Sequence, residues 1–147
     1  MLDEKEDLTL EINKAENLHG HLGPFLVIGV KVARLAKKIL NLNHSSCGEL
    51  QVTAELPLVT PFSCIIDGVQ ALTQCTVGNQ KLKIRNSKDN MAVSFEFKSQ
   101  NRTLRIYVNP EVLEKLKDKL SKGESKEKLA WKTASMPESR LLKVENL

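Results

Sequence analysis

Two of the three histidines of the chain stand two residues apart, in the stretch NLHGHLGP at residues 17–24. His19 and His21 offer imidazole nitrogens, which bind metals, contact anions or transfer protons near neutral pH. In an extended segment, residues i and i+2 point to the same side, so both rings would reach one target. A structured turn in which both rings bond local carbonyls has the same spacing. The His-x-His pair alone therefore leaves the chemistry open.

The residues after the histidines predict the start of a helix. Pro24 suits the first helical position, where its missing N–H costs nothing, and apolar residues continue at helical spacing to about Leu42. The free N–H groups and the dipole of such a helix N-terminus favour an anion or a thiolate. Gly20 and Gly23 would let the backbone come close to that ligand. We therefore expect the histidines to lie beside a helix end that attracts negative charge.

A second helix with chemical potential is predicted from SCIIDGVQALTQC at residues 63–75, with Ser63 as its N-cap and Gly78 near its C-terminal stop. One face of this helix would be small and partly polar, and so able to accept something close by: Cys64, Asp67, Gly68, Ala71 and Cys75. The two cysteines would be roughly 16 Å apart along the helix, too far to bind one metal ion. Cys64 lies at the N-terminus, where a thiolate is stabilised. It is the candidate ligand, and Cys75 is predicted to be structural.

Together the two motifs resemble those of the FmdE family, whose members are related to a component of formylmethanofuran dehydrogenase. Members carry a pattern like His-Gly-His-x-Cys-Pro-Gly at the start of a helix, which His19, His21 and Pro24 match in part. Further on they carry a helix with the pattern Cys-x-x-Asp-x-x-Gln-x-x-Thr-x-Cys-Thr-x-Gly. The residues that match it here are Cys64, Asp67, Gln70, Thr73, Cys75, Thr76 and Gly78. The resemblance covers the chain from about Asn17 to Val144.

The resemblance implies an α+β domain, often dimeric, with a His/Cys cluster that binds a transition metal, zinc in some members. Carried over to this chain, the metal ligands would be His19, His21 and Cys64. Asp67 would orient one of the histidines. The pocket beside them would involve Gly23, Gln70 and Thr73, although the Thr73 hydroxyl can instead bond within its own helix. A small-molecule or anionic ligand would occupy this pocket.

The chain departs from the family pattern at its first motif. Gly23 stands where the family has a cysteine, and Phe25 replaces the glycine after the proline. Three remaining ligands plus water suit an open zinc site. The same loss also suits a degenerate site, in which case the protein would be a non-catalytic dimeric accessory or interaction module. No Cys-x-x-Cys pair is present, so we expect no C-terminal zinc ribbon.

The elements that must position these residues predict an α+β fold of one domain over residues 1–147, with a mostly antiparallel sheet and helices packed on it. The motifs lie in residues 17–110, and a helical extension follows over 110–147. Helices are expected at 8–16, 24–42, 63–75 and from Pro110. Another is expected around Trp131, whose ring would anchor packing, with a homodimer interface as one place for it. Alternating apolar residues predict strands at 49–56, at 81–85, and in a hairpin over 91–108.

Charge and composition exclude several classes of protein. With 22 Lys+Arg against 18 Asp+Glu the chain is only mildly basic and lacks interleaved aromatic residues, so nucleic acid is an improbable partner. The basic residues of the second helix are expected to form a solvated face: Lys31, Arg34, Lys37 and Lys38. His44 and Cys47 are expected in a surface turn. No apolar run spans a bilayer and the start does not have the layout of a signal peptide, so we expect a cytoplasmic protein.

Overall fold

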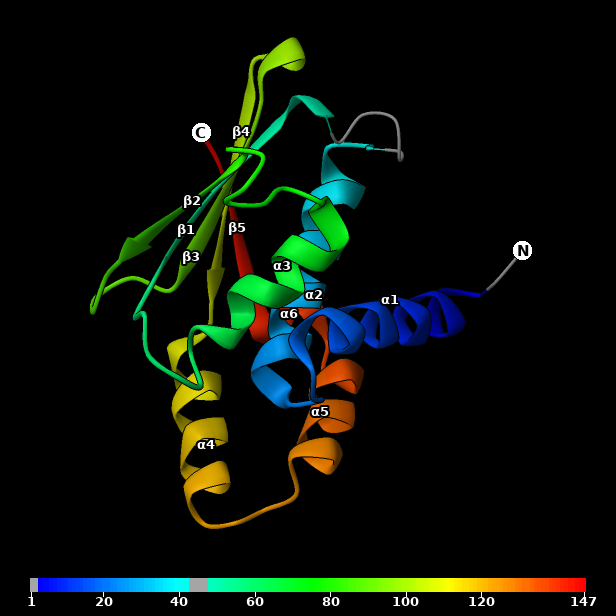
Figure 1. The fold of residues 1–147 in the computed structure, drawn as a ribbon, viewed down its shortest axis with the longest axis vertical. Helices are drawn as coiled ribbons and strands as arrows, with labels where there is room; N and C mark the ends of the chain where they lie inside the picture. Colours follow the sequence, from blue (N-terminus) through cyan, green and yellow to red (C-terminus); the bar gives the residue numbers. More distant parts are fainter. Residues whose placement is uncertain (1–2, 43–47) are drawn as a thin grey trace.

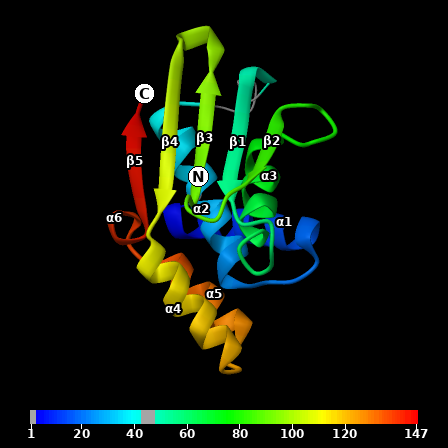
Figure 2. The same cartoon turned by 90° about the vertical axis from the view of Figure 1, so that its left-hand side faces the viewer.

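A five-stranded sheet with helices packed on one face forms the fold (Figures 1 and 2). The computed structural model describes residues 3–42 and 48–147, and the predicted turn at His44 and Cys47 lies outside them. The helices are α1 (Glu4–His19), α2 (Pro24–Ile39), α3 (Cys64–Thr73), α4 (Pro110–Ser121), α5 (Lys126–Ser135) and α6 (Glu138–Leu141). The strands are β1 (Leu50–Leu56), β2 (Leu82–Asn86), β3 (Ala92–Phe97), β4 (Arg102–Val108) and β5 (Leu142–Asn146).

The strands are arranged in the order β2-β1-β3-β4-β5, and all neighbouring pairs are antiparallel except β1 with β2. Along β1 buried and half-buried side chains alternate, as the sequence predicts. The predicted hairpin is β3 and β4, joined by a short 3₁₀ turn (Lys98–Gln100) and by Asn101 in the left-handed region. The predicted α+β fold with a mostly antiparallel sheet is therefore confirmed.

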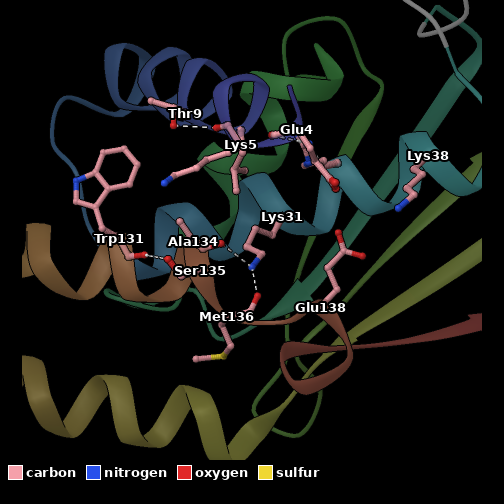
Figure 3. A pocket seen from close by; sticks show the side chains of 12 residues that line it. Glu4, Lys5, Thr9, Lys31, Lys38, Trp131, Ala134, Ser135, Met136 and Glu138 are labelled. Carbon is pink, nitrogen blue, oxygen red and sulfur yellow. Dashed lines mark hydrogen bonds and ion pairs between the residues drawn. The ribbon is translucent and has the colours of Figure 1, made fainter. Parts of the chain in front are cut away.

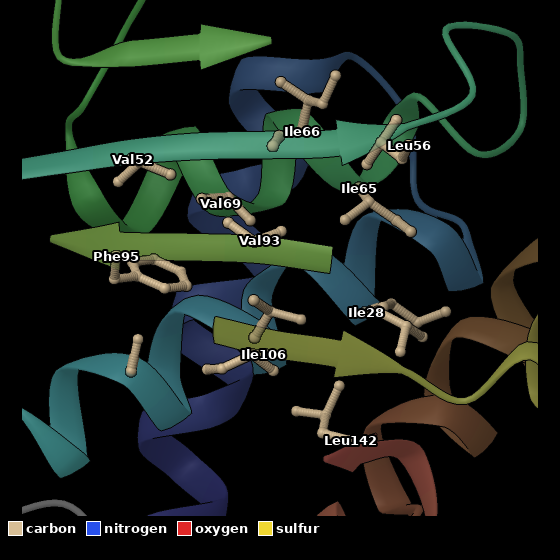
Figure 4. Close-up of a cluster of buried hydrophobic side chains, with 14 of the residues drawn as sticks. Ile28, Val52, Leu56, Ile65, Ile66, Val69, Val93, Phe95, Ile106 and Leu142 are labelled. Atoms are coloured by element: carbon tan, nitrogen blue, oxygen red, sulfur yellow. The ribbon is translucent and has the colours of Figure 1, made fainter. Parts of the chain in front are cut away.

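Helix α2 is the central element, because it is buried by the sheet on one side and by other helices on the others. Nearly all its side chains from Pro24 to Ala33 are buried. Figure 2 shows the sheet in front of α1, α2 and α3, so these helices cover one of its faces. The core between the sheet and these helices is aliphatic with one phenylalanine at its centre, Phe95 (Figure 4). A second cluster joins α1, α2, α3 and α5 and includes Ile12, Leu26 and Ala130.

Two glycines let α2 and α3 approach to backbone contact. A Cβ on Gly29 would lie within 3.0 Å of backbone atoms of Ile65 and Gly68, and a Cβ on Gly68 would overlap the backbone of α2 in the same way. The small face predicted on residues 63–75 thus packs in part against another helix. This close packing sets the position of Cys64, the first residue of α3, relative to the segment that precedes α2.

The helix ends differ from several predictions. Helix α1 begins at Glu4 because Asp3 caps it, and it extends to His19 because the left-handed turn comes only at Gly20 (φ 97°). Helix α2 ends at Ile39, before Leu42. Helix α3 ends at Thr73, followed by Gln74 in the left-handed region, so Gly78 is not its stop.

The start of α3 also differs from the prediction. Ser63 precedes the helix, but its side chain makes no capping hydrogen bond. The first N–H groups of α3 bond instead to carbonyls of the preceding turn, with Cys64 N donating to Pro61 O at 3.1 Å and Ile65 N donating to Phe62 O at 3.1 Å. This end of the helix therefore has few free donors for an anion or thiolate.

The C-terminal region is more than a helical extension. After α4, α5 and α6 the chain returns to the sheet as β5, which pairs antiparallel with β4. Asn109 caps α4 and Ser125 caps α5, each accepting a backbone N–H in the first turn. Among the residues that the structure describes, no helix combines the length and apolarity needed to cross a bilayer.

Candidate metal site

Three side chains predicted as metal ligands meet where α1 ends and α3 begins. One ligand atom from each of His19, His21 and Cys64 lies within 4.8 Å of the other two. His19 is the last residue of α1, His21 follows the left-handed Gly20, and Cys64 opens α3. The two histidines are thus not on an extended segment, as the spacing suggested. The turn at Gly20 brings their rings together instead, with centroids 4.3 Å apart.

His19 is held by Asp67 from the first turn of α3. Its Nδ1 lies 2.6 Å from Asp67 Oδ2, so a proton on Nδ1 would be donated to the carboxylate. The other ring nitrogen, Nε2, is buried and has no hydrogen-bond partner among the residues that the structure describes. This arrangement leaves Nε2 as a lone-pair donor, which is the form that binds a metal ion.

The surroundings set the protonation of the other two groups. Burial, followed by the charges of His19 and Lys126, lowers the pKa of His21, which favours its neutral metal-binding form. Burial raises the pKa of the Cys64 thiol, and the negative charge of Asp67 raises it further. The expected thiolate stabilisation at the start of α3 is therefore wrong for the metal-free chain. The reason is that burial and Asp67 outweigh the helix end, whose N–H groups are already bonded.

The cluster opens into a pocket of about 530 Å³. Gly23 lies in its lining and contributes no side chain, and a Cβ built there would meet nothing within 4 Å. Helices α4 and α5 supply part of the wall, including two lysines, Lys117 and Lys126, that sequence reasoning did not assign to the site. Their local sequence, a charged helix and a polar link, gives no signal of a pocket, because only the tertiary packing of the C-terminal helices brings them here.

The remaining residues of the second motif have other positions. Gln70 and Thr73 are not among the described residues that line this pocket. Thr73 is fully buried, and its hydroxyl donates to Val69 O at 2.8 Å, so it bonds within its own helix. Cys75 is fully buried in the main core, outside α3, with its Sγ 3.5 Å from Leu50 O, in keeping with the predicted structural role.

The basic residues of α2 do not form the expected solvated face. Lys31 is buried, and its ammonium donates to the carbonyl oxygens of Thr133, Ala134 and Met136 at the end of α5 (Figure 3). Arg34 pairs with Glu11 of α1. The helix thus uses these charges to hold neighbouring helices. Trp131 lies at the edge of this second pocket with 40% of its surface exposed, and its expected part in a dimer interface stays a prediction.

The fold and the cluster together define an α+β domain with a candidate His/His/Cys metal site. The model of the family described as FmdE, Molybdenum formylmethanofuran dehydrogenase operon, matches residues 18–144. The chain belongs to the FmdE family. It is similar in fold to the crystal structure of a tungsten formylmethanofuran dehydrogenase (FmdE)-like protein from Syntrophus aciditrophicus. That likeness has a TM-score of 0.67 at 23% identity, over 95% of this chain and 71% of the other.

A curated relative in sequence is a probable S-adenosyl-L-methionine-binding protein from Archaeoglobus fulgidus. It is 31% identical over 108 residues, which are 74% of this chain and 29% of the relative. The chain therefore spans less than a third of that protein's length.

Proposed function

We propose that this protein is a metal-binding FmdE-like domain that holds one transition-metal ion, zinc in the first instance, through His19, His21 and Cys64. The observation that carries the proposal is the buried, unpartnered Nε2 of His19 within a cluster whose three ligand atoms lie within 4.8 Å of one another. A buried ring nitrogen without a partner loses hydrogen bonding to water, and a metal ion would compensate for that loss.

The chemistry of the donor set supports zinc. Two imidazole nitrogens and one thiolate sulfur are ligands that Zn²⁺ prefers, and three protein ligands are typical of sites with an open position. A bound zinc ion would supply Lewis-acid chemistry at that position. Asp67 would hold the His19 ring in the tautomer that directs Nε2 at the metal. His21 is favoured in its neutral form because its pKa is lowered.

The test is metal content and ligand identity in the full chain. We expect about one zinc per chain by plasma mass spectrometry, lost in the His19→Ala, His21→Ala double variant and in Cys64→Ala. Cys75→Ala is the matched control, because Cys75 lies in the core outside the cluster, and it should keep the metal. Cobalt substitution adds a second readout, since thiolate-to-cobalt charge-transfer absorption should require Cys64 and not Cys75.

Absence of metal from the wild type after reconstitution would contradict the proposal. It would favour the second candidate, a non-catalytic dimeric accessory module whose metal site has degenerated. The observation that favours this candidate is Gly23, which lies in the pocket without the family's cysteine. Sedimentation velocity of the same samples would test the homodimer, which we propose for either candidate.

A further inference from the structure

We propose that the pocket beside the cluster binds a small organic oxyanion, a carboxylate or a phosphate with an apolar body, and that Lys117 and Lys126 recognise its charged group. The inference rests on the proposed function, because it places this ligand next to the metal. It adds the chemical class of the ligand and assigns the recognition to helices outside the two sequence motifs.

Two lysines from different helices line the pocket. Lys117 comes from α4, with its Nζ 5.3 Å from the centre of the Phe62 ring, and Lys126 is the first residue of α5. Within the described part of the chain neither forms an ion pair, whereas Lys122, which follows α4, is paired with Asp118 at 2.9 Å. The charge of Lys126 also acts on both His21 and Cys64, so it lies close to the cluster.

The N-terminus of α2 adds backbone donors to the same pocket. Gly23, Pro24, Phe25 and Leu26 all line it, and no side chain caps this helix. The first intrahelical bond is made by Val27 N, so the N–H groups of Phe25 and Leu26 have no acceptor within the helix. These donors and the positive end of the helix dipole favour an oxyanion at this point.

The remaining lining sets the other properties of the ligand. None of the described residues that line the pocket is an aspartate or a glutamate, so no carboxylate repels an anion there. Much of the wall is apolar and suits a hydrocarbon or aromatic body: Pro24, Phe25, Leu26, Pro61 and Leu120. The volume of about 530 Å³ lies within the range of small-molecule sites.

The experiment is calorimetric titration of the zinc-loaded full chain with benzoate and phenyl phosphate, and with benzyl alcohol as their neutral analogue. The two anions distinguish a carboxylate from a phosphate preference. The test variant is Lys117→Met, Lys126→Met. Its control is Lys115→Met, Lys128→Met, which removes the same charge from exposed lysines of the same two helices that do not line this pocket.

We expect at least one anion to bind more tightly than benzyl alcohol. Its affinity should fall about tenfold or more in the test variant and change less than about twofold in the control, because charge-assisted contacts are lost only in the former. Equal affinities of the two variants, or no binding of any probe, would overturn the inference. The zinc content of the same samples tests the proposed function separately. Lysine-dependent binding without zinc would contradict the metal assignment and still support the oxyanion site.

Discussion

The Nδ1 atom of His19 lies 2.6 Å from Oδ2 of Asp67, and this contact joins the end of α1 to the first turn of α3. The two residues are far apart in sequence, so the contact forms only when the helices pack. It fixes the ring of His19 and leaves Nε2 buried, with no partner among the described residues. The carboxylate therefore acts on the site through the histidine, as an orienting group behind a metal ligand.

Replacing the carboxylate of Asp67 should weaken metal binding. We expect Asp67→Asn to lower zinc affinity about 10- to 100-fold, because an amide holds the His19 tautomer less firmly and does not raise its basicity. Competition with a chromophoric chelator measures the effect. Asp118→Asn, which alters an exposed carboxylate of α4, should leave the affinity unchanged. Equal affinities of Asp67→Asn and wild type would show that the carboxylate does not support the ligand.

The alkylation of Cys64 in the metal-free chain should depend on pH in a specific direction. Because burial and Asp67 raise the pKa of this thiol, it is protonated at neutral pH, and its reaction with iodoacetamide should accelerate as pH rises above its ordinary pKa. Asp67→Asn removes the negative charge, so the midpoint of the rate profile should shift to lower pH. Mass spectrometry of the modified peptide gives the rate, with Cys64→Ser as the blank. An unchanged midpoint would exclude Asp67 as a cause of the raised pKa.

The sequence was sufficient to predict elements whose signal is local. Alternating residues specified β1 and the β3–β4 hairpin, and Asn109-Pro110 specified the start of α4. It failed at helix ends decided by backbone geometry, since a residue such as Gln74 gives no sign in advance of a left-handed conformation. It also missed β5 as an edge strand, because pairing with β4 depends on the path of α4 to α6.

The site was predictable in composition and not in geometry. His19, His21 and Cys64 were recognised from motif spacing, but the expected extended segment is a helix end followed by a left-handed glycine. Lys31 shows the same limit, because a lysine in a basic stretch reads as solvated until α5 packs its carbonyls over it. Tertiary contacts from distant segments decide both cases.

The glycine contact between α2 and α3 should tolerate no side chain. A Cβ at Gly29 or Gly68 would overlap backbone atoms of the opposite helix, so each alanine variant must push the helices apart. We expect Gly68→Ala to lower the free energy of unfolding by about 1–3 kcal/mol or more. Urea unfolding followed by circular dichroism measures this loss. Gly23→Ala is the control, since its Cβ meets nothing within 4 Å and its φ of −153° is extended backbone.

The ammonium of Lys31 should stabilise the docking of α5. Lys31→Met keeps a long apolar stem but leaves three carbonyl oxygens at the end of α5 without their donor. We expect a loss of about 1–3 kcal/mol in unfolding free energy, because unpaired buried acceptors keep their full desolvation cost. The single tryptophan, Trp131, lies on α5 and reports the transition by fluorescence. Lys38→Met, exposed on the same helix, should change stability by no more than about 0.5 kcal/mol.

The open space at Gly23 makes a gain of metal ligand testable. The family pattern has a cysteine at this position, and here a Cβ would meet no atom within 4 Å, with no strain from the extended backbone. Gly23→Cys should therefore fold normally and add a second thiolate beside Cys64, completing a two-histidine, two-cysteine set. We expect tighter zinc binding and stronger thiolate-to-cobalt absorption than in wild type, whereas Gly23→Ser should show neither. An unchanged cobalt spectrum in a folded Gly23→Cys protein would show that position 23 does not reach the metal that His19, His21 and Cys64 hold.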